Sequence, residues 1–180
     1  SGTVTGISVG GLPDGIVDRD TLATQAKGSV LQVVQATKTD TFSTTSTSFV
    51  DITGLSASIT PSSTSSKILF QWQTNFSHKE CYNWFQLVRG STALLIGDAA
   101  GSRTRATHGH WIDGSTDMQF LSFNFAGSYL DSPSTTSATT YKLQIRTTQN
   151  TAYVNRSQGD SDNAVESRTA SNIVLMEVAT

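Results

Sequence analysis

At 180 residues and a formal net charge of -2, the chain is long enough for one domain with a substantial core and a short appendage. Only 14% of the residues are charged, and no basic patch or acidic run is present, which argues against a nucleic-acid-binding protein. No apolar run could cross a bilayer and no signal peptide is present, so we expect no membrane insertion. The absence of an initiator methionine is consistent with a fragment or a processed piece.

Residues 1–28 differ in character from the rest of the chain. They are rich in glycine and turn residues, after which Asp18 or Asp20 can cap a short helix that ends at Lys27. The segment is too short to bury its own apolar side chains, so we expect a linker or shaft segment that associates with neighbouring copies. These apolar residues are Ile7, Val9, Leu12, Ile16, Val17 and Leu22.

From residue 29 onwards the pattern is that of strands. Serine and threonine are abundant, and threonine favours strands whereas serine favours turns. In KILFQWQTNF (67–76), apolar and polar residues alternate strictly, which is typical of a half-buried antiparallel strand. The other predicted strands are VLQVVQ (30–35), SFVDI (48–52), LSASIT (55–60), YNWFQLV (82–88), ALLIG (93–97), MQFLSFNF (118–125), TTYKLQIRT (139–147) and NIVLMEV (172–178).

Strands at this close spacing, with no amphipathic helix between them, predict an all-β fold. We expect residues 29–180 to form an antiparallel, jelly-roll-like β-sandwich of about eight or nine strands. The single cysteine, Cys81, excludes an intrachain disulfide, and no base flanks it in sequence, so a buried, inert thiol is expected.

Long stretches of the chain resemble a domain of bacteriophage tail fibres and virion structural proteins that is common among marine phages. They are residues 30–69, 87–107, 131–148, 151–157 and 168–178, which include GSTALLIGDAAGSRTRAT and RTASNIVLMEV; GLPDGIVDRDTLATQAKGSV resembles the linkers before such domains. The resemblance implies a homotrimeric, distal sandwich head in the virion, outside the cell, joined to other fibre or virion proteins. It also implies attachment to a host-surface glycan or protein, with residues 1–28 along the three-fold axis.

The stretch from Gly97 to Trp111 gathers residues of the kind found in functional sites. It does not match a P-loop, which needs GxxxxGK[ST] between a strand and a helix, and its glycines are expected to supply positive-φ turns. The longest break between predicted strands runs from Gly97 to Asp117, and long loops on a sandwich commonly carry recognition. The candidate receptor-binding residues are Arg103, Arg105, His108, His110, Trp111, Asp113 and Asp117.

Exposed aromatic side chains are the usual platforms for sugar rings. Tyr82, Trp84, Trp111 and Tyr153 are the candidates, although strand position also allows Trp84 to belong to the core, as it does for Trp72.

Isolated titratable residues are present without a catalytic motif. The sequence gives no distance between any two of the carboxylates Asp98, Asp113, Asp117 and Asp131, so it does not identify a catalytic pair. No Ser or Cys nucleophile motif accompanies His78, His108 and His110. We therefore expect no enzymatic activity and no cofactor. Two alternatives to receptor binding stay open: a purely structural virion component (a capsid decoration or fibre adaptor), and, less favoured, a glycan-degrading enzyme.

Two short patterns could hold metal ions. In a strand, His108 and His110 would point to the same side, and three copies at a trimer axis would supply six nitrogens for a transition metal. Gly109 and its neighbours favour a solvated loop instead. Asp160 to Asn163, with Glu166, alternate oxygen ligands as a calcium loop does, but they lack the EF-hand glycine and distant glutamate, so we expect a polar turn.

Overall fold

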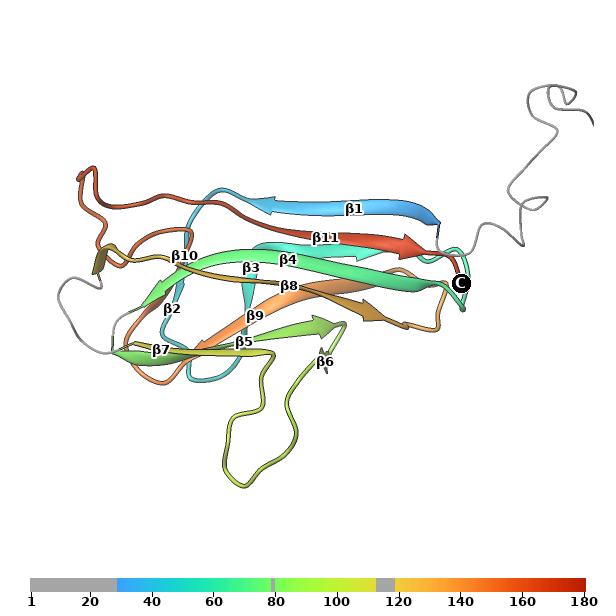
Figure 1. Ribbon diagram of the computed structural model, residues 1–180, viewed down its shortest axis with the longest axis horizontal. Helices are drawn as coiled ribbons and strands as arrows, with labels where there is room; N and C mark the ends of the chain where they lie inside the picture. Colours follow the sequence, from blue (N-terminus) through green and yellow to red (C-terminus); the bar gives the residue numbers. More distant parts are fainter. Residues whose placement is uncertain (1–28, 79, 113–118) are drawn as a thin grey trace, which may run out of the picture.

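The computed structural model describes residues 29–78, 80–112 and 119–180, which form a two-layered β-sandwich (Figure 1). The predicted helix within residues 1–28 lies outside the described residues. No helix in the described part is long and apolar enough to cross a membrane. The eleven strands are β1 (Val30–Lys38), β2 (Phe42–Thr44), β3 (Val50–Ile59), β4 (Lys67–His78), β5 (Cys81–Arg89), β6 (Thr92–Leu94), β7 (His108–Ile112), β8 (Phe123–Asp131), β9 (Thr139–Thr147), β10 (Ala152–Val154) and β11 (Ser171–Val178).

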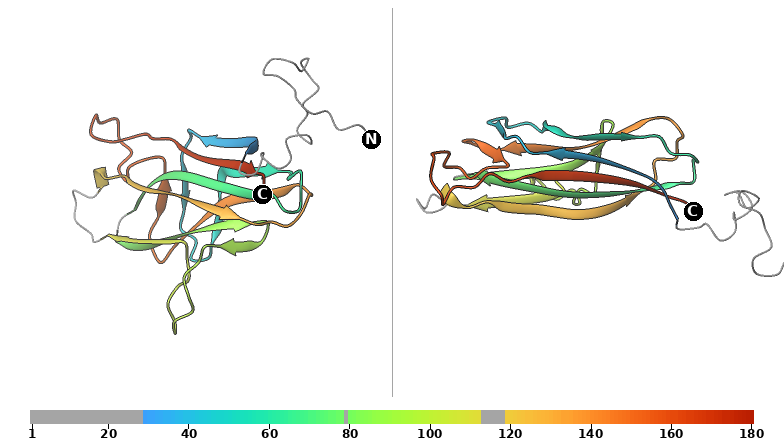
Figure 2. Two further views of the ribbon diagram at one scale, coloured as in Figure 1. Left: turned by 45° about the vertical axis from the view of Figure 1, so that its right-hand side comes forward. Right: turned by 90° about the horizontal axis from the view of Figure 1, so that it is seen from above.

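All strand pairs are antiparallel, and they form one six-stranded and one five-stranded sheet. The six-stranded sheet has the order β1-β11-β4-β10-β2, and β8 pairs with the other edge of β4. The five-stranded sheet has the order β3-β9-β5-β6, and β7 also pairs with β5. Figure 2, in the view from above, shows the two sheets as facing layers. The predicted all-β antiparallel sandwich is therefore confirmed.

The core lies between the sheets and follows the alternation predicted for β4. Ile68, Phe70 and Phe76 are fully buried, and Trp72 is nearly so. Each such side chain stabilises the fold by roughly 1.5–3 kcal/mol. The indole of Trp72 covers Gly127 on the neighbouring strand β8, where an added Cβ would stand 2.7 Å from Cζ2 of the indole. The strand therefore needs glycine at this position.

Several strand boundaries differ from the predicted ones. The two strands predicted at 48–52 and 55–60 merge into one strand, β3, which runs from Val50 to Ile59 and whose register shifts around Gly54, a residue with φ of +90°. The predicted strand 93–97 is reduced to β6, and the predicted strand 118–125 is shifted to β8. β8 continues through small residues of low strand propensity because it pairs with β4 over nine positions, and this pairing outweighs local preference. The short strands β2 and β10 were not predicted.

Two buried carboxylates are tied into the sandwich by hydrogen bonds. Asp131 on β8 accepts from the Tyr141 hydroxyl at 2.6 Å and from the Arg89 guanidinium at 2.8 Å, so it joins the two sheets. Glu177 on β11 accepts from the backbone N–H and the hydroxyl of Ser62 and from the side-chain amide of Gln32. Both ions are buried at the cost of desolvation, which these donors offset.

A candidate glycan-binding surface on β5 and β7

Residues His108 to Ile112 form strand β7, so the prediction that they belong to a solvated loop was wrong. β7 pairs antiparallel with β5, with Trp111 opposite Tyr82 and Gly109 opposite Trp84. β6 pairs only with the C-terminal part of β5. The backbone N–H and C=O groups along the N-terminal part of the same edge also need hydrogen-bond partners, and β7 provides these partners. The predicted break from Gly97 to Asp117 is therefore divided by a strand. The β6–β7 loop comprises residues 95–107.

Strand alternation sorts the side chains of β5 and β7 between the two faces of the sheet. Tyr82, Trp84 and Trp111 point outward, and together we call them the aromatic platform. Trp111 is 54% exposed and Tyr82 is 48% exposed. The rings of Tyr82 and Trp84 are stacked, with centroids 5.4 Å apart, and the ring centroids of Tyr82 and Trp111 lie 5.9 Å apart. Three aromatic rings thus form one continuous apolar surface on rigid strands.

Two neighbours fix the position of Trp84 within the platform. An added Cβ on Gly109 would stand 3.1 Å from Cδ1 of Trp84, so glycine lets the indole lie close over the β7 backbone. On the other side, the guanidinium of Arg146 on β9 lies 5.0 Å from the Trp84 ring centroid, in cation–π geometry. The indole is held between the Gly109 backbone and a cation.

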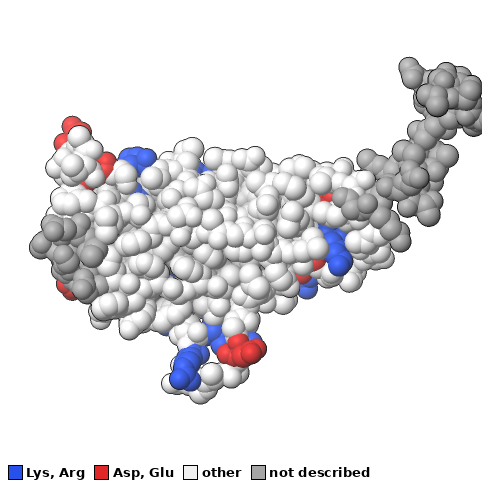
Figure 3. Space-filling model, in the orientation of Figure 1, with Lys and Arg blue, Asp and Glu red and all other residues white. Residues whose placement is uncertain are grey.

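The β6–β7 loop borders the platform and carries its polar rim. A turn closed by the Arg103 N–H on the Ala100 carbonyl uses Gly101 at φ of +59°, as expected, whereas Gly97 and Gly109 do not adopt positive φ. Figure 1 shows this loop projecting from the body of the sandwich, and Figure 3 shows charged side chains on the projection. An open groove of about 550 Å³ lies between loop and platform, lined by Tyr82, Trp84, Ser102, Arg103, Thr104, Gly109, His110 and Trp111.

The groove combines an apolar aromatic floor with hydroxyl and guanidinium donors at its rim. Sugar rings present C–H groups on their faces and hydroxyls at their edges, so a floor of this kind can stack on the ring while the rim donates hydrogen bonds. Arg103, with five N–H donors, can also pair with a carboxylate or sulfate substituent. No Asp or Glu is among the described residues that line the groove.

The predicted receptor-binding residues do not all meet in this groove. Arg103, His110 and Trp111 line it. Arg105 donates from Nε to the Gly97 carbonyl at 2.7 Å, which ties the loop stems together. Asp113 and Asp117 lie outside the described residues.

The aromatic candidates also separate. Tyr82, Trp84 and Trp111 converge, whereas Tyr153 lies on β10 in the other sheet with the Arg156 guanidinium 4.3 Å from its ring centroid. The sequence indicated each platform residue separately, but it did not indicate that Arg146 lies beside Trp84. Its position opposite Trp84 follows only from the β5–β9 register.

His108 and His110 turn their imidazoles to the inner face of β7. The His110 Nδ1 lies 2.8 Å from Nε2 of the buried His78, and its ring lies 4.2 Å from that of Phe123, centroid to centroid. Burial, together with the nearby His110, lowers the pKa of His78 to about 4. Burial also lowers the pKa of His108, and burial with the charge of His108 lowers that of His110. These imidazoles are therefore neutral interior groups near pH 7.

Cys81 is buried, as predicted, but a base does lie near it. Its Sγ is 3.5 Å from Nδ1 of His78, three residues earlier, because both face the interior. Among residues 29–78, 80–112 and 119–180, no three His, Cys, Asp or Glu side chains could hold a metal ion. The metal hypothesis for His108 and His110 therefore gains no support from their arrangement.

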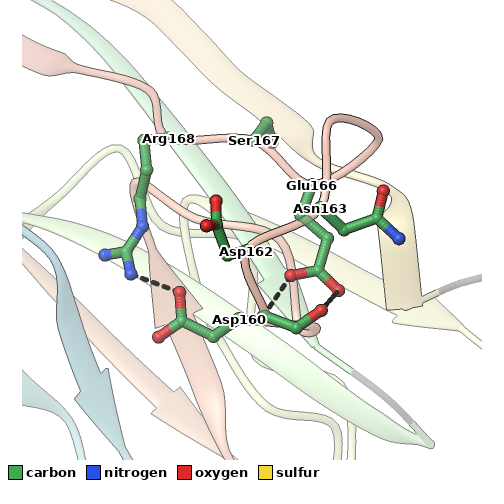
Figure 4. A pocket seen from close by; sticks show the side chains of 7 residues that line it. Asp160, Asp162, Asn163, Glu166, Ser167 and Arg168 are labelled. Carbon is green, nitrogen blue, oxygen red and sulfur yellow. Dashed lines mark hydrogen bonds and ion pairs between the residues drawn. The ribbon is translucent and has the colours of Figure 1, made fainter.

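The acidic stretch from Asp160 to Glu166 forms a polar turn, as expected. Asp160 pairs with Arg156 at 2.8 Å and with Arg168. Glu166 accepts hydrogen bonds from the backbone N–H and the hydroxyl of Ser161. Figure 4 shows the carboxylates of Asp160 and Glu166 directed at these different partners rather than at a common point. Both carboxylates are therefore paired with donors of the same turn and its flanks.

Comparison with known proteins assigns the chain to no family. The chain matches no known protein-family profile. No curated protein matches its sequence. Among solved structures, it is similar to one titled "Structure of infectious bursal disease virus Gx strain", with 15% sequence identity and a TM-score of 0.38 over 83% of this chain. The chain spans 37% of the length of that viral chain, and a TM-score this low does not establish a common fold.

Proposed function

We propose that this protein is the distal head of a bacteriophage tail fibre and that it binds a glycan of the host surface through the aromatic platform. The observation that carries the proposal is the contact of Tyr82, Trp84 and Trp111 on the outer face of one sheet, with two of the three rings about half exposed. The resemblance of long stretches of the sequence to tail-fibre domains supports the proposed location in a tail fibre.

A binding role fits the groove better than catalysis does. Glycoside hydrolysis generally needs a pair of carboxyl groups on either side of the scissile bond. The described lining residues provide aromatic, hydroxyl and guanidinium groups instead. A contiguous patch of exposed aromatic rings on a protein surface commonly marks a site where a partner or ligand binds. A saccharide would cover this floor.

Binding of the purified full chain to host cells tests the proposal. The wild-type chain should bind saturably and should block adsorption of the phage. Tyr82→Ala with Trp111→Ala removes two platform rings, and we expect at least a tenfold loss of binding with an unchanged circular dichroism spectrum. Val165→Ala, at a 60% exposed position on a distant turn, is the matched control. Binding within twofold of wild type in the double variant would contradict the proposal.

The second candidate is a purely structural virion component that never contacts the host. The observation that favours it is the uncharged outer face of the six-stranded sheet, because such a face suits permanent packing against protein. Imaging the virion with a label on this chain distinguishes the two roles. A label at the fibre tip supports host attachment, and a label on the capsid or at an internal joint supports the structural role.

A further inference from the structure

The positive charges that have no counterion gather around the aromatic platform. Ion pairs join several lysines and arginines to carboxylates, namely Lys38, Arg89, Lys142, Arg156 and Arg168. Within residues 29–78, 80–112 and 119–180, the lysines and arginines that form no ion pair are Arg103, Arg105, Arg146 and Lys67. The three arginines lie on the β6–β7 loop or beside the platform, and Lys67 lies on the other sheet.

Arg103 brings one of these charges to the groove. Its guanidinium is exposed, and among the described residues only the Ala100 carbonyl accepts a hydrogen bond from it, at 3.2 Å. A guanidinium has five N–H donors, so most of those of Arg103 remain available to a ligand in the groove. Arg105 adds a second positive charge to the same loop, although its Nε–H is bound to the Gly97 carbonyl.

Arg146 places a third charge on the opposite side of Trp84. β5 lies between β7 and β9, and the register puts Gly109 and Arg146 on either side of Trp84. These three positions span two strand spacings, which is about 10 Å. The Arg146 guanidinium lies over the Trp84 ring, and its Nε–H is buried with no acceptor among the described residues. A half-buried cation without a counterion carries a desolvation cost that an anionic ligand would offset.

The described carboxylates around the platform do not neutralise these charges. Asp98 is the only acidic residue of the β6–β7 loop, and it forms no ion pair with a described residue. Asp51, on the outer face of the same sheet, is already bound to Lys142 at 2.8 Å and to Gln144 at 2.6 Å. Glu80 lines a separate pocket. The described surroundings of the platform are therefore net positive, although the whole chain has a formal net charge of -2.

We infer that the saccharide bound by the platform is acidic and carries carboxylate or sulfate groups along its chain, an inference that rests on the proposed function. The sugar faces stack on the aromatic floor, while Arg103 binds an anionic group on the loop side and Arg146 binds one on the β9 side. A guanidinium pairs with the oxygens of a carboxylate or sulfate through two parallel hydrogen bonds. Because the two cations stand on either side of the floor, a chain with repeated anionic groups fits better than one with a single terminal anion.

Competition with polysaccharide extracted from the host cells tests the inference. The purified full chain binds to the cells in the presence of either the untreated polysaccharide or the same material after carboxyl reduction and desulfation, which leave the sugar rings in place. We expect the untreated polymer to compete roughly tenfold better than the neutralised one, because the neutralised one loses hydrogen bonds to charged groups. Carboxyl reduction alone and desulfation alone then identify the anion. Raising the salt concentration from about 0.1 M to about 1 M shortens the Debye length from about 10 Å to about 3 Å, so it should weaken binding of the untreated polymer only.

Substitutions of single cations assign the effect to the two arginines. Arg103→Glu should lower the affinity for the untreated polysaccharide roughly tenfold, and Arg103→Lys, which keeps the charge, should lose less. Arg146→Met removes the charge on the β9 side but keeps an unbranched side chain beside Trp84, and we expect a similar loss. Lys67→Glu is the matched control, because it changes the net charge as Arg103→Glu does but on the other sheet, and it should bind as the wild type does.

The outcomes separate this inference from the proposed function. Equal competition by the untreated and the neutralised polysaccharide overturns the inference, and the proposed function still stands if Tyr82→Ala with Trp111→Ala abolishes binding. Full binding by Arg103→Glu or by Arg146→Met overturns the assignment of an anionic group to that arginine. If no form of the polysaccharide competes with the cells, the ligand is not this saccharide, and the proposed function fails together with the inference.

Discussion

The Cβ that Gly109 lacks would stand 3.1 Å from Cδ1 of Trp84, across the β5–β7 ladder. This contact is tighter than ordinary van der Waals packing, so the position of the indole depends on the glycine. The arrangement of the platform is therefore determined by backbone as well as by aromatic side chains.

Gly109→Ala should push the Trp84 indole away from β7 and separate it from Tyr82. We expect a loss of stability of about 1 kcal/mol and a several-fold loss of host-cell binding, since the floor of the groove is no longer continuous. Tryptophan fluorescence and urea unfolding measure the first effect, and cell binding the second. Gly97→Ala is the control, because an added Cβ there meets nothing within 4 Å. Equal behaviour of the two variants would contradict the prediction.

Trp111→Ala and His110→Ala should have opposite effects. Trp111 is largely exposed, so its removal should abolish most binding and leave the melting temperature nearly unchanged. His110 contacts His78 and Phe123 in the interior, so its removal should lower the free energy of unfolding by about 1–3 kcal/mol. Thermal unfolding and cell binding of each single variant check this. A stable His110→Ala protein would refute the interior role of that side chain.

Acid should destabilise the protein through its buried histidines. The pKa of His78 is lowered from 6.5 to about 4 in the folded chain, so above pH 6.5 the imidazole is neutral in both states and stability is intact. As the pH falls from 6.5 towards 4, the unfolded state binds the proton first, which costs the folded state up to about 3 kcal/mol. Urea unfolding across this range measures the slope. His78→Gln should flatten it, and an unchanged slope would count against the assignment.

Glu177→Gln should destabilise the fold at neutral pH. Burial alone would raise the pKa of Glu177, but hydrogen bonds from Ser62, Gln32 and Ser66 lower it to about 2. The stabilisation is complete above pH 4.5 and is lost as the pH falls towards 2. We expect a cost of about 2 kcal/mol at pH 7, because an amide N–H₂ would face the donors of Ser62. Unfolding at pH 7 and pH 2.5 should show the difference from wild type shrinking, and Glu80→Gln, at an exposed site, should cost nothing.

The sandwich could be predicted from the sequence because its long strands carry their own pattern. In β4, alternation from Ile68 to Phe76 identifies both the strand and its buried face. Strand β7 could not be recognised in this way, since it is five residues long and contains Gly109, and its pairing partner lies more than twenty residues earlier. The β8 boundary was missed because small residues there are held by β4 rather than by their own propensity.

The candidate site was predictable only in part for the same reason. Tyr82 and Trp84 are two residues apart in a predicted strand, so their common face could be inferred. The proximity of Trp111 depends on the β5–β7 register, and the inward direction of His108 and His110 follows from that same pairing. A residue type suggests a chemistry, but the neighbouring strand decides whether the side chain reaches solvent.

The aromatic platform lies on the outer face of the five-stranded sheet. If several copies of the chain stand side by side in a fibre, as the resemblance to tail fibres implies, each copy presents a groove of its own. A repetitive cell-surface polysaccharide could then engage two or three grooves at once, and linked binding of this kind can exceed single-site affinity by roughly 10²- to 10⁴-fold. Each groove can therefore bind a saccharide with low affinity. Loss of the groove in one copy would increase the rate at which the whole particle dissociates from the cell.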